Sequence, residues 1–484
     1  MPLPDLSPRR RRLVLAICCL SLLVVTMDST IVNVALPSLR RDLDASVSSL
    51  QWTIDAYTLV LASFLMLAGS TADRVGRRRT FQTGLAVFGL GSLLCSLAPS
   101  AGWLIVARAV QACGGAMLNP VAMSIITNTF IDRVERARAI GVWGAVSGLS
   151  LGLGPVVGGV LVDTVGWRSV FWINVPIVVL AIVGTALFVP ESRSVRARRF
   201  DPVGQGLVIM VLGSTVYGII EGPRLGWSSP QILGLGALAL AGVVGLLVYE
   251  PRRSDPLLEL RFFRSVPFSG ATVTAVAAFF GFGSFLFLNA LYLQDVRGFS
   301  ALHAGLCTLP VAVLIVLLAP ISGRIVGKLG TRLPMVVAGT AIAVAGLAFT
   351  WLTPTTPIPV LLAIYLVFGI GQGMINPPIT NSAVSGMPVS MAGVAASVAS
   401  TSRQTGITLG VAVSGSIVGA SLTRGGTAFT TAAETVWWLV SALGVLIVAL
   451  GLYSSGRRAL DTARQAAALF DGMDRAVPVR AGAK

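Results

Sequence analysis

The sequence predicts an all-α membrane protein with fourteen transmembrane helices, arranged as two six-helix bundles with two further helices inserted between them in the chain. Of the 484 residues, 54% are hydrophobic and only 12% are charged, and the mean hydropathy is +0.83. A soluble protein of this size has about twice that charged fraction. The apolar residues form runs of about 20, each long enough to cross a bilayer as a helix. A short basic loop also occurs twice, which indicates a duplicated unit.

Each apolar run ends where charged residues, glycines or prolines interrupt it. The first run follows a group of arginines and is similar to a signal peptide, but the many later runs favour an uncleaved first helix. The predicted helices cover residues 13–36, 50–70, 80–98, 103–128, 139–162, 169–189, 202–220, 231–249, 267–293, 303–325, 333–352, 358–380, 391–420 and 434–454. We expect the following parts: a cytoplasmic N-terminus (1–12), an N-terminal bundle (13–189), a linker with the two inserted helices (190–264), a C-terminal bundle (265–455) and a cytoplasmic tail (456–484).

The positions of the basic residues predict that both termini are cytoplasmic. With the N-terminus inside, 28 of the 36 Lys and Arg residues fall in inside segments and six in outside segments. Positive charge is retained on the cytoplasmic side of membrane proteins. Arg108 and Arg403 are the remaining two, and both fall within helices. The net charge of +16 is therefore explained by topology, and the absence of a long basic stripe argues against nucleic-acid binding.

The repeated loop follows the second and the tenth predicted helix. "GSTADRVGRRR" runs from Gly69 to Arg79, and "GRIVGKLGTR" runs from Gly323 to Arg332. Glycines and basic residues align, whereas the acid Asp73 has no counterpart in the second copy. The matching places predict two parallel halves with a substrate site between them near the membrane midplane.

Five motifs in order resemble those of one family. They read "MDSTIVNVALP" in the first helix, "GSTADRVGRRR" after the second, "RAVQACGGA" in the fourth, "GVWGAVSGLSLGLGPVVGG" in the fifth and "GWRSVFWINVP" before the sixth. The chain resembles the major facilitator superfamily over about residues 13–455, and within it the fourteen-helix drug:proton antiporters of bacterial multidrug and antibiotic resistance. Met27, Ala112 and Ser150 depart from the usual patterns. The resemblance implies the major facilitator fold.

Three charges lie at a similar depth in the first half. Counted at about 1.5 Å per residue, Asp28, Asp55 and Arg108 lie about 12, 8 and 9 Å below the outer surface. Charged side chains within a membrane usually pair and face the interior of a bundle or a water cavity. The resemblance implies that Asp28 and Arg108, with Gln111 one turn further on, take part in proton coupling or substrate binding. Asp55 is a second acid for a cationic or polar drug. The alternative for each acid is a purely structural role in packing.

The second half has a charge of its own at Arg403, near the midplane of the thirteenth helix and followed by Gln404. These two residues suit an anionic or polar substrate group, or alternatively a contact with carbonyls at a helix end. Weaker candidates for lining a cavity are polar and aromatic residues within helices, the last of them next to two prolines: Asn33, Trp143, Asn289, Tyr292 and Asn376.

Two further sets of residues take their roles from the resemblance. It implies a cytoplasmic gate that holds the halves together, formed by Gly69, Asp73, Arg74, Gly76, Arg77 and Arg78. It also implies an antiporter motif linked to export and to sealing against proton leak, formed by Gly154, Pro155, Gly158 and Gly159. Gly144, Gly148 and Gly152 recur every four residues and predict a ridge for close helix packing, and Pro155 predicts a kink.

The leading hypothesis is proton-coupled export of antibiotics or other amphipathic drugs across the cytoplasmic membrane, which confers resistance. The alternative is a proton-coupled exporter of one endogenous metabolite, such as a lipid, siderophore or amino acid. Uptake by symport is disfavoured by the resemblance of the fifth helix. We expect no enzyme, cofactor or metal, because no nucleophile–base pair, phosphate loop or metal-ligand spacing occurs. The expected partners are a small-molecule drug, protons and the lipid bilayer, and we expect a monomer.

Overall fold

The protein is described by a computed structural model for residues 7–193, 200–253, 255–385, 387, 391–422 and 424–470. Parts of the predicted N-terminal segment, linker and tail, at residues 1–6, 194–199 and 471–484, lie outside the described residues. The elements are α1 (Pro8–Asp42), α2 (Val47–Val75), α3 (Arg77–Ser96), α4 (Ala101–Thr129), α5 (Arg133–Thr164), α6 (Ser169–Trp172), α7 (Asn174–Phe188), α8 (Pro202–Leu225), α9 (Pro230–Tyr249), η1 (Glu250–Arg252), η2 (Leu260–Arg264), α10 (Val266–Leu291), η3 (Tyr292–Val296), α11 (Ala301–Leu329), α12 (Arg332–Phe349), α13 (Ile358–Val384), α14 (Ala392–Val418), α15 (Gly426–Ser454) and α16 (Arg457–Ala468).

The described residues form helices and connecting turns, without a strand. Twelve of the helices are long and apolar enough to cross a membrane. Among the predicted spans, α3 and α14 are not in that set. α3 begins with three arginines, and α14 contains Arg403 and many small polar residues, which lowers the hydropathy of both. The sixth predicted span is divided at Ile173 into α6 and α7.

Side-chain caps fix where many helices begin. A serine or aspartate at such a position accepts a hydrogen bond from a backbone N–H of the first turn, which would otherwise lack a partner. The caps of this kind are Ser7, Ser46, Ser100, Asp132, Asp201, Ser229, Ser265 and Ser300. These residues stand outside the apolar runs, directly before the helices that they cap.

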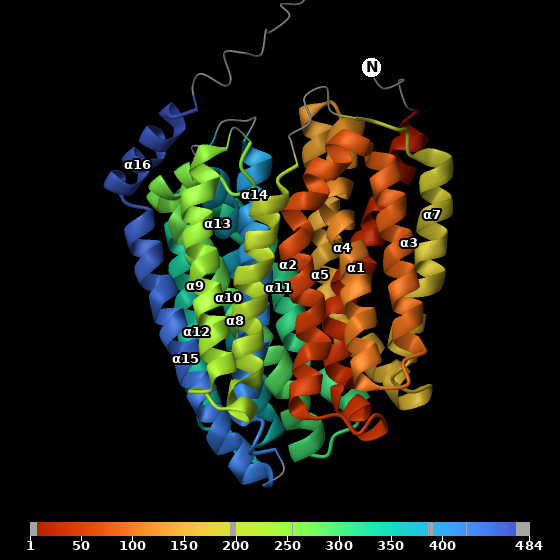
Figure 1. The fold of residues 1–484 in the computed structure, drawn as a ribbon, viewed down its shortest axis with the longest axis vertical. Coiled ribbons are helices and arrows are strands. Elements are labelled where there is room, and N and C mark those ends of the chain that lie inside the picture. The colour runs from red at the N-terminus through yellow and green to blue at the C-terminus, as the bar shows by residue number, and fades with distance from the viewer. Residues whose placement is uncertain are drawn as a thin grey trace, which may run out of the picture.

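The helices pack as two bundles side by side (Figure 1). The N-terminal bundle comprises α1–α7, and the C-terminal bundle comprises α10–α15; within each, neighbouring helices pack closely. We call the end at which α1 begins and α16 lies the near end, and the opposite end the far end; the figure places the near end at the top.

The inserted helix α8 packs on α9 and on one helix of each bundle, α2 and α14. Glu221, near the far end of α8, accepts hydrogen bonds from Ser48 Oγ (2.7 Å) and Trp52 Nε1 (3.1 Å) of α2. Toward the near end, Gln205 Nε2 donates to the Ser63 carbonyl of α2 (2.8 Å). Thus α8 runs along the line where the two bundles meet.

The bundles are joined at the far end. Arg40 of α1 forms an ion pair with Asp295 of η3 (3.4 Å). Asp163, at the end of α5, accepts hydrogen bonds from the backbone N–H groups of Ala301 (3.1 Å) and Leu302 (2.9 Å). A carboxylate is favoured there because the first turn of α11 presents unpaired N–H groups and the positive end of the helix dipole.

Toward the near end the bundles separate. The hydrogen bond between them that lies closest to this end joins Thr401 Oγ1 to the Ala62 carbonyl (3.5 Å), and beyond it the described residues form no hydrogen bond or ion pair between the bundles. A Cβ added at four glycines nearer to this end would meet no neighbouring atom within 4 Å: Gly141 and Gly144 of α5, and Gly323 and Gly327 of α11. The bundles are therefore joined at the far end, and α5 and α11 separate from each other toward the near end.

Candidate functional site

A buried network surrounds Asp28 of α1. Its Oδ2 atom accepts a hydrogen bond from the Arg108 guanidinium of α4 (2.5 Å), which makes an ion pair. Its Oδ1 atom accepts from Gln111 Nε2 (2.8 Å) and from Asn174 Nδ2 of α7 (2.9 Å). All four side chains are at most 1% exposed. The ion pair is thus enclosed by protein, and neutral donors occupy the second carboxylate oxygen.

A second layer of contacts connects this network to α2, α3 and α6. Ser92 Oγ of α3 accepts from Gln111 (3.1 Å) and Asn174 (3.0 Å), and donates to the Phe171 carbonyl (3.0 Å). Arg108 also donates from Nε to the Thr53 carbonyl of α2 (3.1 Å). Its guanidinium lies over the ring of Tyr57, 4.1 Å from the centroid, in cation–π geometry. Breaking the pair would therefore affect most of the N-terminal bundle.

The sequence indicated part of this network. Asp28 and Arg108 are brought together as their common depth suggests, and Gln111, one turn further along α4, also contacts Asp28. Asn174 and Ser92 were missed as members of the site. Asn174 lies in the "INVP" part of the motif before the sixth predicted helix, where it is one amide in an apolar run, and a single serine in an apolar helix gives no signal of its own.

We expect Asn174→Ala to lower the free energy of unfolding by about 1–3 kcal/mol, because it removes a buried donor to a charged acceptor. The measurement is thermal unfolding of the purified protein in detergent. The control is Asn381→Ala, which changes an exposed asparagine of α13 and should leave the melting temperature unchanged. Equal melting temperatures for the two variants would show that the Asn174 contact contributes nothing.

Asp55 lies apart from this ion pair, on the face of α2 that packs against α14. Gln51 and Thr58 share that face: Gln51 Nε2 donates to the Ala412 carbonyl (2.7 Å), and Thr408 Oγ1 lies 2.7 Å from Thr58 Oγ1. Asp55 is fully buried; its Oδ1 atom has a long hydrogen bond from Thr58 (3.5 Å), and its Oδ2 atom has no partner among the described residues. The second acid is therefore at the contact between the bundles.

Arg403 lies on α14 and is partly exposed. It donates to Ser400 Oγ (2.7 Å) and to Asn376 Oδ1 of α13 (3.3 Å). The Oε1 atom of Gln404 is buried and has no partner among the described residues. Arg403 therefore lies next to Gln404 in the sequence and contacts Asn376 in space. Among the described residues it forms no ion pair.

The predicted gate residues are held within the N-terminal bundle. Asp73 pairs with Arg77 one turn further on (2.9 Å). The backbone N–H of Arg78 donates to Glu191 Oε1 (3.2 Å) after the end of α7. Gly76 joins α2 to α3 with φ of +122°, and a Cβ there would lie 2.6 Å from the same oxygen, so both backbone freedom and space require glycine.

The other two gate candidates lie at the near end. Arg74 is exposed, and a Cβ added at Gly69 would meet no atom within 4 Å. A contact between this loop and the C-terminal bundle stays a prediction, for a form of the protein that is closed at the near end.

Two glycines of the predicted antiporter motif let α5 approach α1. A Cβ at Gly154 would lie within 3 Å of Thr30 Oγ1, and one at Gly158 within 3 Å of the Ile31 side chain. α5 continues as one helix through Pro155, from Arg133 to Thr164. These positions hold α5 against the helix that carries Asp28.

The other motif positions face α11 of the C-terminal bundle. A Cβ at Gly159 would lie 2.6 Å from Leu302 Cα, and one at Gly152 would lie 2.6 Å from Ala312 Cβ. The predicted close-packing ridge is wrong for Gly144, which has no neighbour within 4 Å, because α5 and α11 have separated at that level. The ridge is shifted toward the far end.

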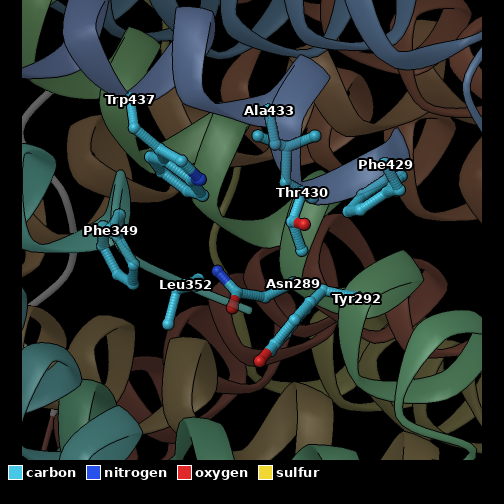
Figure 2. A pocket seen from close by; sticks show the side chains of 9 residues that line it. Asn289, Tyr292, Phe349, Leu352, Phe429, Thr430, Ala433 and Trp437 are labelled. Carbon is cyan, nitrogen blue, oxygen red and sulfur yellow. The ribbon is translucent and has the colours of Figure 1, made fainter. Parts of the chain in front are cut away.

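The weaker lining candidates divide between the bundles. Asn289 and Tyr292 border a pocket of about 10 Å³ inside the C-terminal bundle, among α10, α12 and α15 (Figure 2). That volume is about enough for one water molecule, so this pocket is too small for a drug. Asn33 Oδ1 and Trp143 Nε1 are buried polar atoms without a partner among the described residues.

The described residues contain no group of three or more His, Cys, Asp or Glu side chains that could hold a metal ion. The five cysteines are free thiols.

Comparison with solved structures gives the same fold at low sequence identity. A bacterial homolog of the human lysosomal transporter Spinster, in an inward-facing and occupied conformation, matches with a TM-score of 0.64 and 18% identity, over 97% of this chain and 98% of that one. The nucleoside transporter NupG matches with a TM-score of 0.61 and 14% identity, over 92% and 100%.

Curated relatives are more similar in sequence. Multidrug resistance protein Stp of Mycobacterium tuberculosis is 36% identical over 86% of this chain and 77% of the relative. Puromycin resistance protein pur8 of Streptomyces alboniger is 37% identical over 85% and 82%, and the tetracenomycin C resistance and export protein of Streptomyces glaucescens is 35% identical over 81% and 73%. The family profile described as Major Facilitator Superfamily matches residues 18–411. The chain therefore belongs to the major facilitator superfamily of membrane transporters, with multidrug and antibiotic resistance proteins among its relatives.

Proposed function

We propose that the protein exports antibiotics or other amphipathic drugs across the cytoplasmic membrane in exchange for protons. The observation that carries the proposal is the buried Asp28–Arg108 ion pair with its neutral partners. A proton that binds Asp28 removes the negative charge and leaves the guanidinium without its counter-ion. That single change alters the contacts of α1, α4 and α7 together, so it can couple proton binding to a rearrangement of the bundle. The resistance relatives support a drug as the cargo.

The proposal includes the topology expected from the sequence. α3 and α14 complete fourteen spans, since each packs within its bundle beside helices that meet the length and hydropathy criteria. The bundles correspond to residues 13–189 and 265–455, the inserted pair lies within 190–264, and the protein acts as a monomer. The near end carries the basic loops and is cytoplasmic. α5 and α11 then separate toward the cytoplasm, where an exporter takes up its cargo.

Inverted membrane vesicles that hold a proton gradient test the coupling. Drug addition should collapse the gradient with the parent protein, and Asp28→Asn should abolish that response. Asp461→Asn, at an acid on α16 that is paired and exposed, is the matched control and should behave as the parent. Asp55→Asn reports whether the acid at the bundle contact is needed as well.

The parent protein and each variant must be present in the vesicles in equal amounts of folded protein. Asp28→Asn leaves Arg108 buried without a counter-ion, so Asp28→Asn/Arg108→Gln, which removes both charges, is tested beside it. The proposal predicts that this double variant folds and remains uncoupled. A gradient that collapses normally with Asp28→Asn rejects Asp28 as the coupling acid. No response to any drug in the parent favours the exporter of a single metabolite.

A further inference from the structure

Arg403 is a membrane-embedded cation that proton coupling through Asp28 does not use. It lies eleven residues after the start of α14 at Ala392, which corresponds to about 16 Å at 1.5 Å per residue. That is about half of a hydrocarbon core of roughly 30 Å. A charge at this depth is costly unless it is paired or faces water.

The contacts of Arg403 leave its charge without a counter-ion. Its two hydrogen-bond partners, Ser400 and Asn376, are neutral, and no carboxylate of the described chain lies within 4.0 Å of its guanidinium. Arg108 differs, because Asp28 neutralises it at 2.5 Å. A guanidinium has five N–H donors in a planar fork that matches a carboxylate. Arg403 uses its N–H groups for only two hydrogen bonds, to Ser400 Oγ and Asn376 Oδ1, so other N–H donors of its guanidinium are available to a ligand.

Exposed polar side chains of α13 lie near Arg403. Asn376 is exposed in the last third of the long helix α13, as are Thr380 and Asn381 nearer its end, and Arg403 is partly exposed. Polar side chains within a span face a cavity or a bundle interior rather than lipid. Arg403 and Asn376 therefore form a polar surface within the span that is not fully covered by the described residues.

We infer that Arg403, positioned by Asn376 and Ser400, is a subsite for a carboxylate or a similarly delocalised anionic group of the exported compound. The inference rests on the proposed function for the cargo being an exported compound, and it names the class: an amphipathic aromatic molecule with an anionic group. The fork of Arg403 binds the anion, and the apolar body of the compound lies against the bundles.

Equilibrium binding to the purified full-length protein in detergent tests the inference. Rhodamine 110 carries a free carboxylate, and rhodamine 123 is its methyl ester, so the pair differs at the group in question. Fluorescence anisotropy should show that the parent binds rhodamine 110 at least about tenfold more tightly, as hydrogen bonds to a charged group allow. Arg403→Gln should remove that preference and leave the affinity for the ester unchanged.

Two further variants, together with thermal unfolding of each protein, distinguish a loss of binding from a failure to fold. Arg403→Lys keeps the charge but loses the fork, so it should retain part of the preference. Asn376→Leu removes a positioning contact and should reduce the preference less than Arg403→Gln does. If Arg403→Gln does not fold, these two variants decide the question.

The inference is overturned if the parent binds both dyes equally, if it binds neither, or if the variants weaken both dyes alike. Binding is measured without a proton gradient, so it is independent of the vesicle experiment. If the carboxylate preference depends on Arg403 but drugs do not collapse the proton gradient in vesicles, proton antiport is rejected and the Arg403 subsite is kept. If drugs collapse the gradient but the dyes show no carboxylate preference that depends on Arg403, the subsite is rejected and antiport is kept.

Discussion

Gly305→Val should slow transport strongly while each bundle stays folded. Gly305 of α11 faces α5 where the bundles touch, and a Cβ there would lie within 3 Å of the Pro155 carbonyl group. Overpacking of this kind costs about 1–3 kcal/mol. The cost falls on the form that is closed at the far end, so the balance between the two forms should shift by about 5–150-fold. A transporter that closes one end less often completes its cycle more slowly.

Cross-linking at the far end measures this shift. Arg40→Cys and Asp295→Cys, introduced in a background without the native cysteines, replace the ion pair between α1 and η3 and should be joined by a short bifunctional thiol reagent, which bridges the distance that the arginine side chain spans. Gly305→Val should suppress that cross-link. Gly236→Val, on the peripheral helix α9 where a Cβ meets no atom within 4 Å, should preserve both cross-linking and transport. Unchanged cross-linking with Gly305→Val would contradict the role given to this contact.

The helices themselves could be predicted because length and hydropathy decide what can cross a bilayer. Their ends could not, since helices extend past the apolar run where capping and charged side chains support them. α1 begins at Pro8, capped by Ser7, rather than at residue 13, and α5 begins at Arg133 after the Asp132 cap rather than at residue 139. The separation of α5 from α11 at Gly144 was also not predictable, because a glycine repeat does not report how far a partner helix follows.

The depth of a charge could be predicted, but its direction could not. Counting residues placed Asp28 and Arg108 at one level, and they are paired. The same count placed Asp55 with them, yet it faces α14 together with Gln51 and Thr58. The number of residues along a helix determines the depth of a side chain in the membrane. The neighbour that the side chain faces depends on how the helices are arranged around it, which the residue count does not give. Neutral partners such as Asn174 are harder still, because a single amide in an apolar run has many possible roles.

Arg108→Met should destabilise the N-terminal bundle strongly. Methionine is unbranched and flexible and can fill part of the space left by the arginine stem, but it leaves Asp28 buried without a counter-ion. Removing one partner of a buried ion pair costs about 3–5 kcal/mol, a large part of a total stability of about 5–15 kcal/mol. The expected result is a marked loss of monodisperse protein and a lower melting temperature. Arg458→Met, at an exposed arginine of α16, is the control.

The paired change Asp28→Asn/Arg108→Met separates stability from function. It removes both charges and keeps an amide that can still accept from Gln111 and Asn174, so it should recover most of the stability lost in Arg108→Met. It should not recover transport, because no titratable group remains at the network. If the pair were only a packing device, stability and transport would return together. If the double variant melts as low as Arg108→Met, the charge on Asp28 is not what the arginine compensates, and the cation–π contact with Tyr57 becomes the better explanation.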